Sequence, residues 1–313
     1  MPAPKLVKSV LHTIGNTPVV QLRKVVPEGA ADVFLKLEFF NPTGSYKDRM
    51  ALAMVEGAEQ RGTLKPGMRV IEFTGGSTGS SLAMVCAVKG YAFNPVSSDA
   101  FAAEKLLTMR AFGASLIVEP SDGGKITPDL FVRMNDLTRK MAQEPGTFFT
   151  NQFHNDDALN GYGKIGDELI EQLGGNFTVY CGAVGTGGML MGVSRALKRG
   201  GCKARVIALE PASSPILTKG ESGSHRIEGI GTGRRVPHLD DAYFDEARAI
   251  DEGAAREMAR RLAKEEGILV GTSSGVNVAG AIEIAKELGK GATVVTVAVD
   301  TGLKYLAGDL YTG

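Results

Sequence analysis

The sequence predicts an α/β protein built as two three-layer lobes, each with a mostly parallel sheet. Segments 204–210 and 292–299 are almost continuously apolar and rich in β-branched residues, which is typical of strands buried on both faces. Such runs alternate with helical stretches, and this order indicates βαβ units. We expect a smaller lobe over 42–154 and a larger lobe that combines 1–41 with 155–313.

The predicted elements follow one another in a regular order. A strand over 69–73 and a helix that ends at Gly90 enclose a glycine-rich loop. Further strands are expected over 115–120, 177–182, 204–210 and 292–299, and a second glycine-rich loop leads from 177–182 into a helix that ends near Lys198. Ligands of parallel sheets bind at the carboxyl ends of the strands. The loops at these ends are therefore the candidates for a ligand site.

Charge and composition exclude several classes of protein. The 313 residues carry 35 Lys+Arg and 35 Asp+Glu, and this balance argues against a nucleic-acid-binding or polybasic membrane-surface protein. No apolar run approaches the roughly 20 residues of a membrane helix, and the N-terminus lacks the apolar stretch of a signal peptide. Three cysteines without a CxxC pair suit a reducing compartment, so we expect a cytoplasmic protein.

The segment NPTGSYKDR (41–49) places a lysine where a helix is expected to begin, near Ser45. The positive end of a helix disfavours an ammonium group, so it should lower the pKa of Lys47 and favour the neutral amine. A neutral lysine amine is what a nucleophile or a Schiff base requires. The alternative is an exposed lysine balanced by Asp48.

The loop TGGSTG (74–79) offers successive backbone amides at the start of a helix, an arrangement that binds small carboxylates. The alternative is a tight turn in which Ser77 or Thr78 caps the helix. The loop also matches G-x-S-x-G, the nucleophile elbow of hydrolases, in which Ser77 would act with His225 or His238. This pattern alone does not decide between the three.

Three further segments are candidates. GTGG (185–188) is either a phosphate cradle or a helix cap, and it matches neither G-x-G-x-x-G nor a Walker A loop. GTSSG (271–275) also matches G-x-S-x-G and is expected to place a hydroxyl at the end of a strand. IEGIG (227–231) is a candidate closing loop. The four histidines lack metal-ligand spacing, so no metal site is expected.

Taken together and in this order, the segments resemble the cysteine synthase and cystathionine β-synthase family of pyridoxal-phosphate enzymes. Their fold is known as type II, or tryptophan-synthase-β-like. The resemblance runs from IGNTPVVQL (14–22) to DTGLKYLAGDLY (300–311), and NPTGSYKDR is close to the family's Schiff-base signature. It implies that the smaller lobe is mobile and that the larger lobe binds the cofactor.

The resemblance also implies a role for each loop. Lys47 forms the Schiff base with pyridoxal phosphate and then acts as the base on the substrate. The other residues that hold the cofactor are Ser77, Gly185, Thr186, Gly187, Gly188 and Ser273. Those that bind the substrate are Thr74, Gly75, Gly76, Thr78, Gln152 and Gly229.

Ser273 is expected to face the pyridine nitrogen of the cofactor. A serine there, unlike an aspartate, need not protonate the ring, and this favours loss of a β-leaving group over transamination. Asp300 is a second candidate for the same place. If Asp300 approached the nitrogen instead, the argument for an unprotonated ring would fail.

The reaction that the resemblance implies is β-replacement on an activated L-serine, with O-acetylserine and sulfide giving L-cysteine and acetate. Cystathionine β-synthase activity, replacement on O-phosphoserine and serine dehydratase activity stay open. So do a serine hydrolase that uses Ser77 and a binding protein without turnover. The expected partners are the amino acid, sulfide or a thiol, a second copy in a homodimer and the C-terminus of a serine acetyltransferase, with no nucleic acid and no membrane.

Three departures from the family's pattern concern the site. The family's loop TSGNTG reads TGGSTG here, so Gly75 replaces a serine and Ser77 an asparagine. Met189 removes a hydroxyl that usually follows the phosphate loop. Arg234 and Arg235 replace an apolar pair, and they either face solvent or attract an acidic second substrate.

Overall fold

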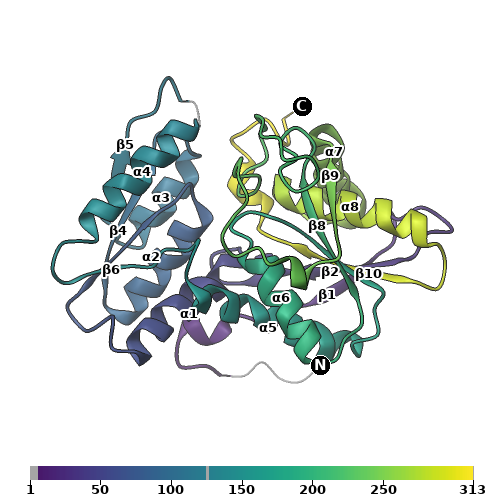
Figure 1. Cartoon of the computed structure of the whole chain (residues 1–313), viewed down its shortest axis with the longest axis horizontal. Coiled ribbons are helices and arrows are strands. Elements are labelled where there is room, and N and C mark those ends of the chain that lie inside the picture. The colour runs from purple at the N-terminus through teal and green to yellow at the C-terminus, as the bar shows by residue number, and fades with distance from the viewer. Residues whose placement is uncertain (1–5, 125–126, 313) are drawn as a thin grey trace.

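The computed structural model describes residues 6–124 and 127–312. Figure 1 shows two sheets side by side, each covered by helices. The smaller sheet has four parallel strands, in the spatial order β5 (Ile117–Glu119), β4 (Ala92–Ser98), β3 (Arg69–Phe73) and β6 (Thr147–Phe149). Its helices are α2 (Ser77–Lys89), α3 (Ala103–Ala111) and α4 (Pro128–Met141).

The larger sheet has six strands, in the order β1 (Val19–Leu22), β2 (Asp32–Leu37), β10 (Thr293–Ala298), β7 (Val179–Ala183), β8 (Arg205–Pro211) and β9 (Glu246–Ile250). Every pairing is parallel except that of β1 with β2. Its helices are α5 (Asp156–Leu173), α6 (Gly188–Arg199), α7 (Glu252–Arg261) and α8 (Thr272–Leu288). The predicted α/β fold with mostly parallel sheets is confirmed, while the lobe boundaries at 42 and 154 stay a prediction.

Of the five strands that the sequence predicts, four are buried along almost their whole length, and the fifth, β5, is not. The strand over 69–73 is β3, and β7, β8 and β10 lie within two residues of the predicted ranges; only β5 is markedly shorter than its prediction. Helix α2 ends where expected, because Gly90 adopts the left-handed conformation and its N–H bonds back to the Cys86 carbonyl. Among the described residues, no helix is long and apolar enough to cross a bilayer.

The segment before GTSSG is not a strand, which corrects one expectation. The chain leaves a π-helical turn (Leu262–Glu266) at Gly267, whose φ of +71° ends the helix. Only three residues separate Gly267 from Gly271, so Val270 forms a single isolated bridge, with Thr301, instead of a ladder. Helix α8 therefore starts from a short loop that is fixed against the end of β10.

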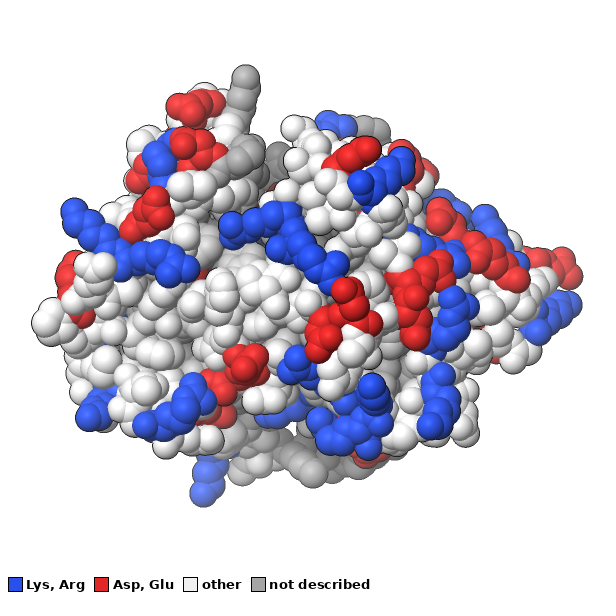
Figure 2. Space-filling model, in the orientation of Figure 1, with Lys and Arg blue, Asp and Glu red and all other residues white. Residues whose placement is uncertain are grey.

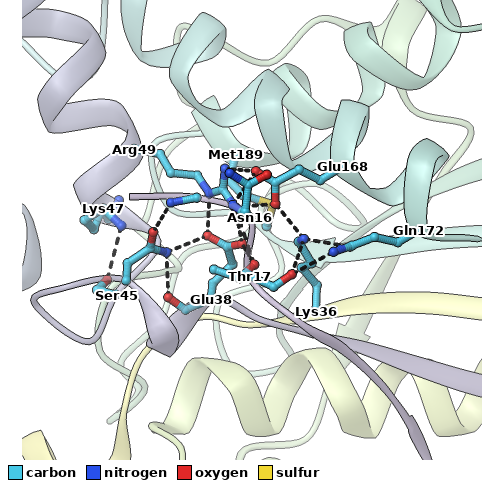
Figure 3. Close-up of polar contacts among 12 residues, drawn as sticks. Asn16, Thr17, Lys36, Glu38, Ser45, Lys47, Arg49, Glu168, Gln172 and Met189 are labelled. Atoms are coloured by element: carbon cyan, nitrogen blue, oxygen red, sulfur yellow. Dashed lines mark hydrogen bonds and ion pairs between the residues drawn. The ribbon is translucent and has the colours of Figure 1, made fainter. Parts of the chain in front are cut away.

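Helix α1 (Lys47–Gln60) packs against both α2 and α5, so it lies where the two parts of the molecule meet. A buried network of charges holds it there (Figure 3). Arg49 pairs with Glu38 at 2.7 Å and with Glu168 at 2.6 Å, and Lys36 pairs with Glu168 at 2.6 Å. The side chains of Lys36, Glu38 and Arg49 are at most 1% exposed.

The charges in this network depend on one another. Burial opposes the charged form of Glu168, but hydrogen bonds and charges from Arg49 and Lys36 outweigh it and lower the pKa of Glu168 to about 2. Lys36 lies on β2 and Glu38 directly follows it, while Arg49 lies on α1 and Glu168 on α5. The network therefore fixes the start of α1 against the larger sheet.

Replacing Arg49 tests this network. Arg49→Met leaves the carboxylates of Glu38 and Glu168 without their main partner, and we expect the free energy of unfolding to fall by about 3–5 kcal/mol. Arg61→Met is the matched control, because the Arg61 side chain is 53% exposed in its pair with Asp157 and should change little. Urea unfolding followed by circular dichroism measures both, and equal losses in the two variants would contradict the assignment.

Candidate active site

Lys47 is the first residue of α1, and its backbone N–H donates to the Ser45 hydroxyl at 3.3 Å. The helix thus begins two residues later than the sequence predicts. The side chain is 8% exposed, and its Nζ lies 5.0 Å from the ring centroid of Tyr46 and 5.8 Å from that of Tyr162. An amine in this position is enclosed by aromatic faces.

Burial lowers the pKa of Lys47 to about 8, although the carboxylates of Asp300 and Glu72 act in the opposite direction. The predicted direction is confirmed, but the lowering comes from burial and not from the predicted effect of the helix end. The alternative of an exposed lysine balanced by Asp48 is wrong. Asp48 is itself buried and accepts hydrogen bonds from the backbone N–H and the hydroxyl of Thr43.

The loop between β7 and α6 presents backbone amides at the start of a helix. Gly187 has a φ of +82°, a conformation that glycine adopts without strain, and no side chain caps the helix behind it. The Thr186 hydroxyl accepts a hydrogen bond from the N–H of Gly188 at 3.3 Å. This contact is of the kind that the helix-cap alternative requires, so that alternative stays open, while the backbone amides of the first turn also suit an anion.

Segment 227–231 and Lys47 both lie close to the loop 185–188. A Cβ on Gly185 would overlap the carbonyl oxygen of Gly229, so segment 227–231 lies directly against the loop. A Cβ on Gly188 would lie 3.2 Å from the Tyr162 ring. Because the same ring neighbours Lys47, the structure places the lysine and the candidate phosphate-binding loop 185–188 around one aromatic side chain.

Thr74, Gly76, Thr78 and Gln152 are also brought together. The Thr74 hydroxyl accepts from the N–H groups of Gly76 and Gly79 at 3.0 and 3.3 Å, and the Thr78 hydroxyl donates to Gln152 Oε1 at 2.9 Å. The N-cap of α2 is Gly76, without a side-chain cap, so the alternative of a cap by residue 77 or 78 is wrong.

Glu72 was missed at the sequence level, although a carboxylate within the apolar strand RVIEF was a signal for it. It is fully buried and accepts hydrogen bonds from the Thr150 hydroxyl at 2.6 Å and from the N–H groups of Gln152 and Phe73 at 3.0 Å. Burial raises the pKa of Glu72 to about 7. This carboxylate fixes the backbone that carries Gln152.

Ser273 and Asp300 both lie near the start of α8. Ser273 is the second residue of that helix, and each is 3% exposed. Asp300 Oδ2 accepts a hydrogen bond from the Tyr305 hydroxyl at 2.8 Å, while a Cβ on Gly271 would overlap Oδ1. Burial raises the pKa of Asp300. The assignment of Ser273 to the pyridine nitrogen stays a prediction.

The histidines do not form a hydrolase site with Ser77. The ring nitrogens of His225 lie 2.9 Å from the Gly231 carbonyl and 3.2 Å from the Ile227 N–H, and His238 Nε2 lies 3.1 Å from the Gln152 carbonyl. Both ring nitrogens of His225 are thus engaged by the backbone, and no hydrogen bond joins Ser77 to either histidine within the described part of the chain. The hydrolase alternative is therefore not supported.

The departures at Met189 and at the arginine pair have local explanations. Met189 accepts a hydrogen bond from the buried Tyr180 hydroxyl at its sulfur, at 2.8 Å. Arg234 lies 6.0 Å from the ring centroid of Phe153, and Arg235 pairs with Asp241 at 2.5 Å. Both arginines are exposed.

Comparison with known proteins places this geometry in a family. Residues 10–300 match the family described as pyridoxal-phosphate dependent enzyme. The chain is 42% identical to the cysteine synthase of Staphylococcus aureus over 99% of its own length and 98% of that protein. In structure it is similar to O-ureido-L-serine synthase (TM-score 0.90, 36% identity, 99% and 96% of the chains) and to the Entamoeba histolytica cysteine synthase (0.92, 34%, 100% and 93%).

The chain belongs to the cysteine synthase and cystathionine β-synthase family of pyridoxal-phosphate-dependent enzymes. Its fold is that of type II enzymes of this class. The residues present fit the cofactor, because a buried lysine of lowered pKa neighbours an uncapped helix start in which side chains would not fit. In addition, the buried atoms Tyr162 Oη and Asp300 Oδ1 have no hydrogen-bond partner within the described part of the chain.

Cofactor uptake should report the pKa of Lys47. Only the neutral amine attacks an aldehyde, so the rate at which cofactor-free protein becomes covalently labelled should rise with pH through about 8, well below the 10.5 of an ordinary lysine. Stopped-flow absorbance and mass spectrometry after borohydride reduction measure this. Lys47→Ala, which binds the cofactor without the covalent bond, controls for titration of the cofactor itself, and a wild-type rate that merely parallels this control contradicts the assignment.

Proposed function

We propose that this enzyme converts O-acetyl-L-serine and sulfide to L-cysteine and acetate. The observation that carries the proposal is the position of Lys47, which is buried at the start of α1 with its pKa lowered to about 8. The names of the relatives in Staphylococcus aureus and Entamoeba histolytica support it further.

Pyridoxal phosphate, when bound, supplies an electron-withdrawing ring that makes the α-proton of an amino acid removable. Backbone amides at the start of α6, with Thr186, would hold its phosphate. Lys47 would hold the aldehyde group and afterwards take the α-proton at Nζ, which its lowered pKa permits. Ser77 and Ser273 would contact the ring.

The substrate's carboxylate would bind to the loop that runs from Thr74 to Thr78, next to Gln152. The hydroxyl of Thr74 already orients the amides of this loop, so little reorganisation is needed. Gly229 would close the site from the other side, against Gly185. Movement of the smaller lobe, residues 42–154, would exclude water while the β-substituent is exchanged.

The proposed setting is a homodimer in the cytoplasm, with the C-terminus of a serine acetyltransferase as a further partner. Exposed apolar side chains such as Phe40 and Leu303, 60% and 63% exposed, support burial by a second copy. Three free cysteines, of which Cys86 and Cys181 are buried, support a reducing compartment.

The decisive assay follows L-cysteine and acetate after O-acetyl-L-serine and sulfide are mixed with the cofactor-loaded enzyme. We expect turnover in the wild type and its loss by several orders of magnitude in Lys47→Ala, because this variant removes the amine that would hold the aldehyde and take the α-proton. Lys89→Ala, in a part-buried pair with Glu59 at the C-terminal end of α2, is the control that should retain activity. Loaded wild-type enzyme that produces no cysteine would refute the proposal.

A second candidate, replacement on O-phospho-L-serine, is favoured by a basic cavity. Lys and Arg side chains gather near the middle of the face in Figure 2. A cavity of about 200 Å³ is lined by Phe73, Asn135, Arg139, Asn151, Phe153, His154, Arg234, Arg235 and Pro237. Phe73 directly precedes the proposed carboxylate loop, so the cavity adjoins it. Arg235 is paired with Asp241, whereas no ion pair with a carboxylate is found for Arg139 or Arg234 among the described residues.

Comparison of two substrates tests the second candidate. Replacing both Arg234 and Arg235 by alanine should lower kcat/KM for O-phospho-L-serine about tenfold, since a hydrogen bond to a charged group contributes about 1.5–3 kcal/mol. The value for O-acetyl-L-serine should change little. If the wild type does not use O-phospho-L-serine, or if both substrates are affected equally, the arginines do not read a phosphate.

A further inference from the structure

The segment that leads into α3 lies on two glycines of the loop 74–79. A Cβ on Gly75 would lie 2.6 Å from Cε1 of Phe101, and a Cβ on Gly76 would overlap Cδ of Lys105. Phe101 is 9% exposed and packs against Phe131, with ring centroids 6.1 Å apart, so it is anchored beneath α4. The departure from serine at Gly75 thus has a steric reason, because the ring occupies the space of a side chain.

Lys105 continues from this contact to the other part of the molecule. Its side chain is 4% exposed, its ammonium pairs with Glu228, and it lies 4.7 Å from the ring centroid of Tyr305. Glu228 belongs to segment 227–231, and its N–H donates to the Thr272 hydroxyl at 3.3 Å, at the first residue of α8. One side chain therefore connects the loop 74–79 to the start of α8.

The connection constrains the loop. A buried ammonium is costly without its counter-charge, so Lys105 keeps its position only while Glu228 is within reach. Because the ammonium is held at Glu228 and over Tyr305, the methylene stem cannot swing away from Gly76. The stem fills the space that a side chain on Gly76 would take. The loop is thus held by packing against this stem, and the stem is held in turn by the ion pair with Glu228.

We propose that Lys105 is a positioning residue for the amino-acid carboxylate. It holds the loop 74–79 in its binding conformation by linking that loop to Glu228, so that carboxylate binding and approach of the two lobes occur together. This inference rests on the proposed function, since it takes the loop as the carboxylate site. No motif in the sequence indicated the pairing of residues 105 and 228.

The test uses L-alanine, which carries the carboxylate but no β-leaving group, and the cofactor-loaded enzyme. Lys105→Met keeps the stem and removes the charge, and we expect L-alanine to bind about tenfold more weakly, by calorimetry. Hydrogen exchange of the amides of residues 74–79 should slow on L-alanine binding in the wild type and much less in Lys105→Met. Lys105→Arg should restore both.

Two further variants sharpen the test. Glu228→Gln removes the same pair from the other lobe, so its effect should not add to that of Lys105→Met in a double-mutant cycle. Should Lys105→Met unfold or lose cofactor, Glu228→Gln alone must reproduce the weaker binding. Lys89→Met, whose pair with Glu59 at 2.8 Å joins α2 to α1, is the matched control and should behave like the wild type.

The outcomes separate this inference from the proposed function. Wild-type affinity and protection in both Lys105→Met and Glu228→Gln overturn the positioning role, even if the enzyme makes cysteine. Full additivity of the two variants also overturns it. Conversely, an enzyme that makes no cysteine but loses L-alanine affinity in both variants refutes the proposed reaction and leaves the positioning role supported.

Discussion

The buried position of Lys47 is the constraint on which most of the structure depends. An amine whose pKa is lowered towards physiological pH has to leave water, and here it does so at the first residue of a helix, between aromatic rings. Such a helix start needs support. Arg49, two residues later, supplies it by pairing with carboxylates that follow β2 and lie on α5. The first turn of α1 thus carries both Lys47 and Arg49, the residue that fixes this helix against the larger sheet.

The two proposed anion sites rely on backbone amides and not on charged side chains. The loops before α2 and α6 expose backbone amides instead of basic side chains, and their glycines allow other groups to approach closely. At Gly185 the close neighbour is a carbonyl, at Gly75 an aromatic ring and at Gly76 a lysine stem. A neutral chain can therefore bind anionic ligands, and the identity of each glycine is set by what lies against it.

The sequence predicted the elements whose residues face apolar surroundings on both sides. Strands β3, β7, β8 and β10 are of this kind, whereas β6 has only three residues and β9 carries charges at alternate positions, so neither shows a continuous apolar run. The two glycine-rich loops 74–79 and 185–188 could be identified as candidate ligand sites because they directly follow such strands, β3 and β7. Glu228 and Lys105 were not paired, because 123 residues separate them and neither belongs to a local pattern. The reason for Gly75 likewise lies in a ring that follows it by 26 positions in the chain.

The two buried cysteines bear on the proposed reaction, which uses sulfide and releases a thiol. Burial raises the pKa of Cys86 and that of Cys181 to about 12, so both remain thiols where exposed cysteines would partly ionise. Exchange with disulfides and oxidation to persulfides both begin from a thiolate that can be reached. In the proposed reaction sulfide and a thiol product surround the protein, and the packing that stabilises the fold also keeps these two thiols unreactive towards them.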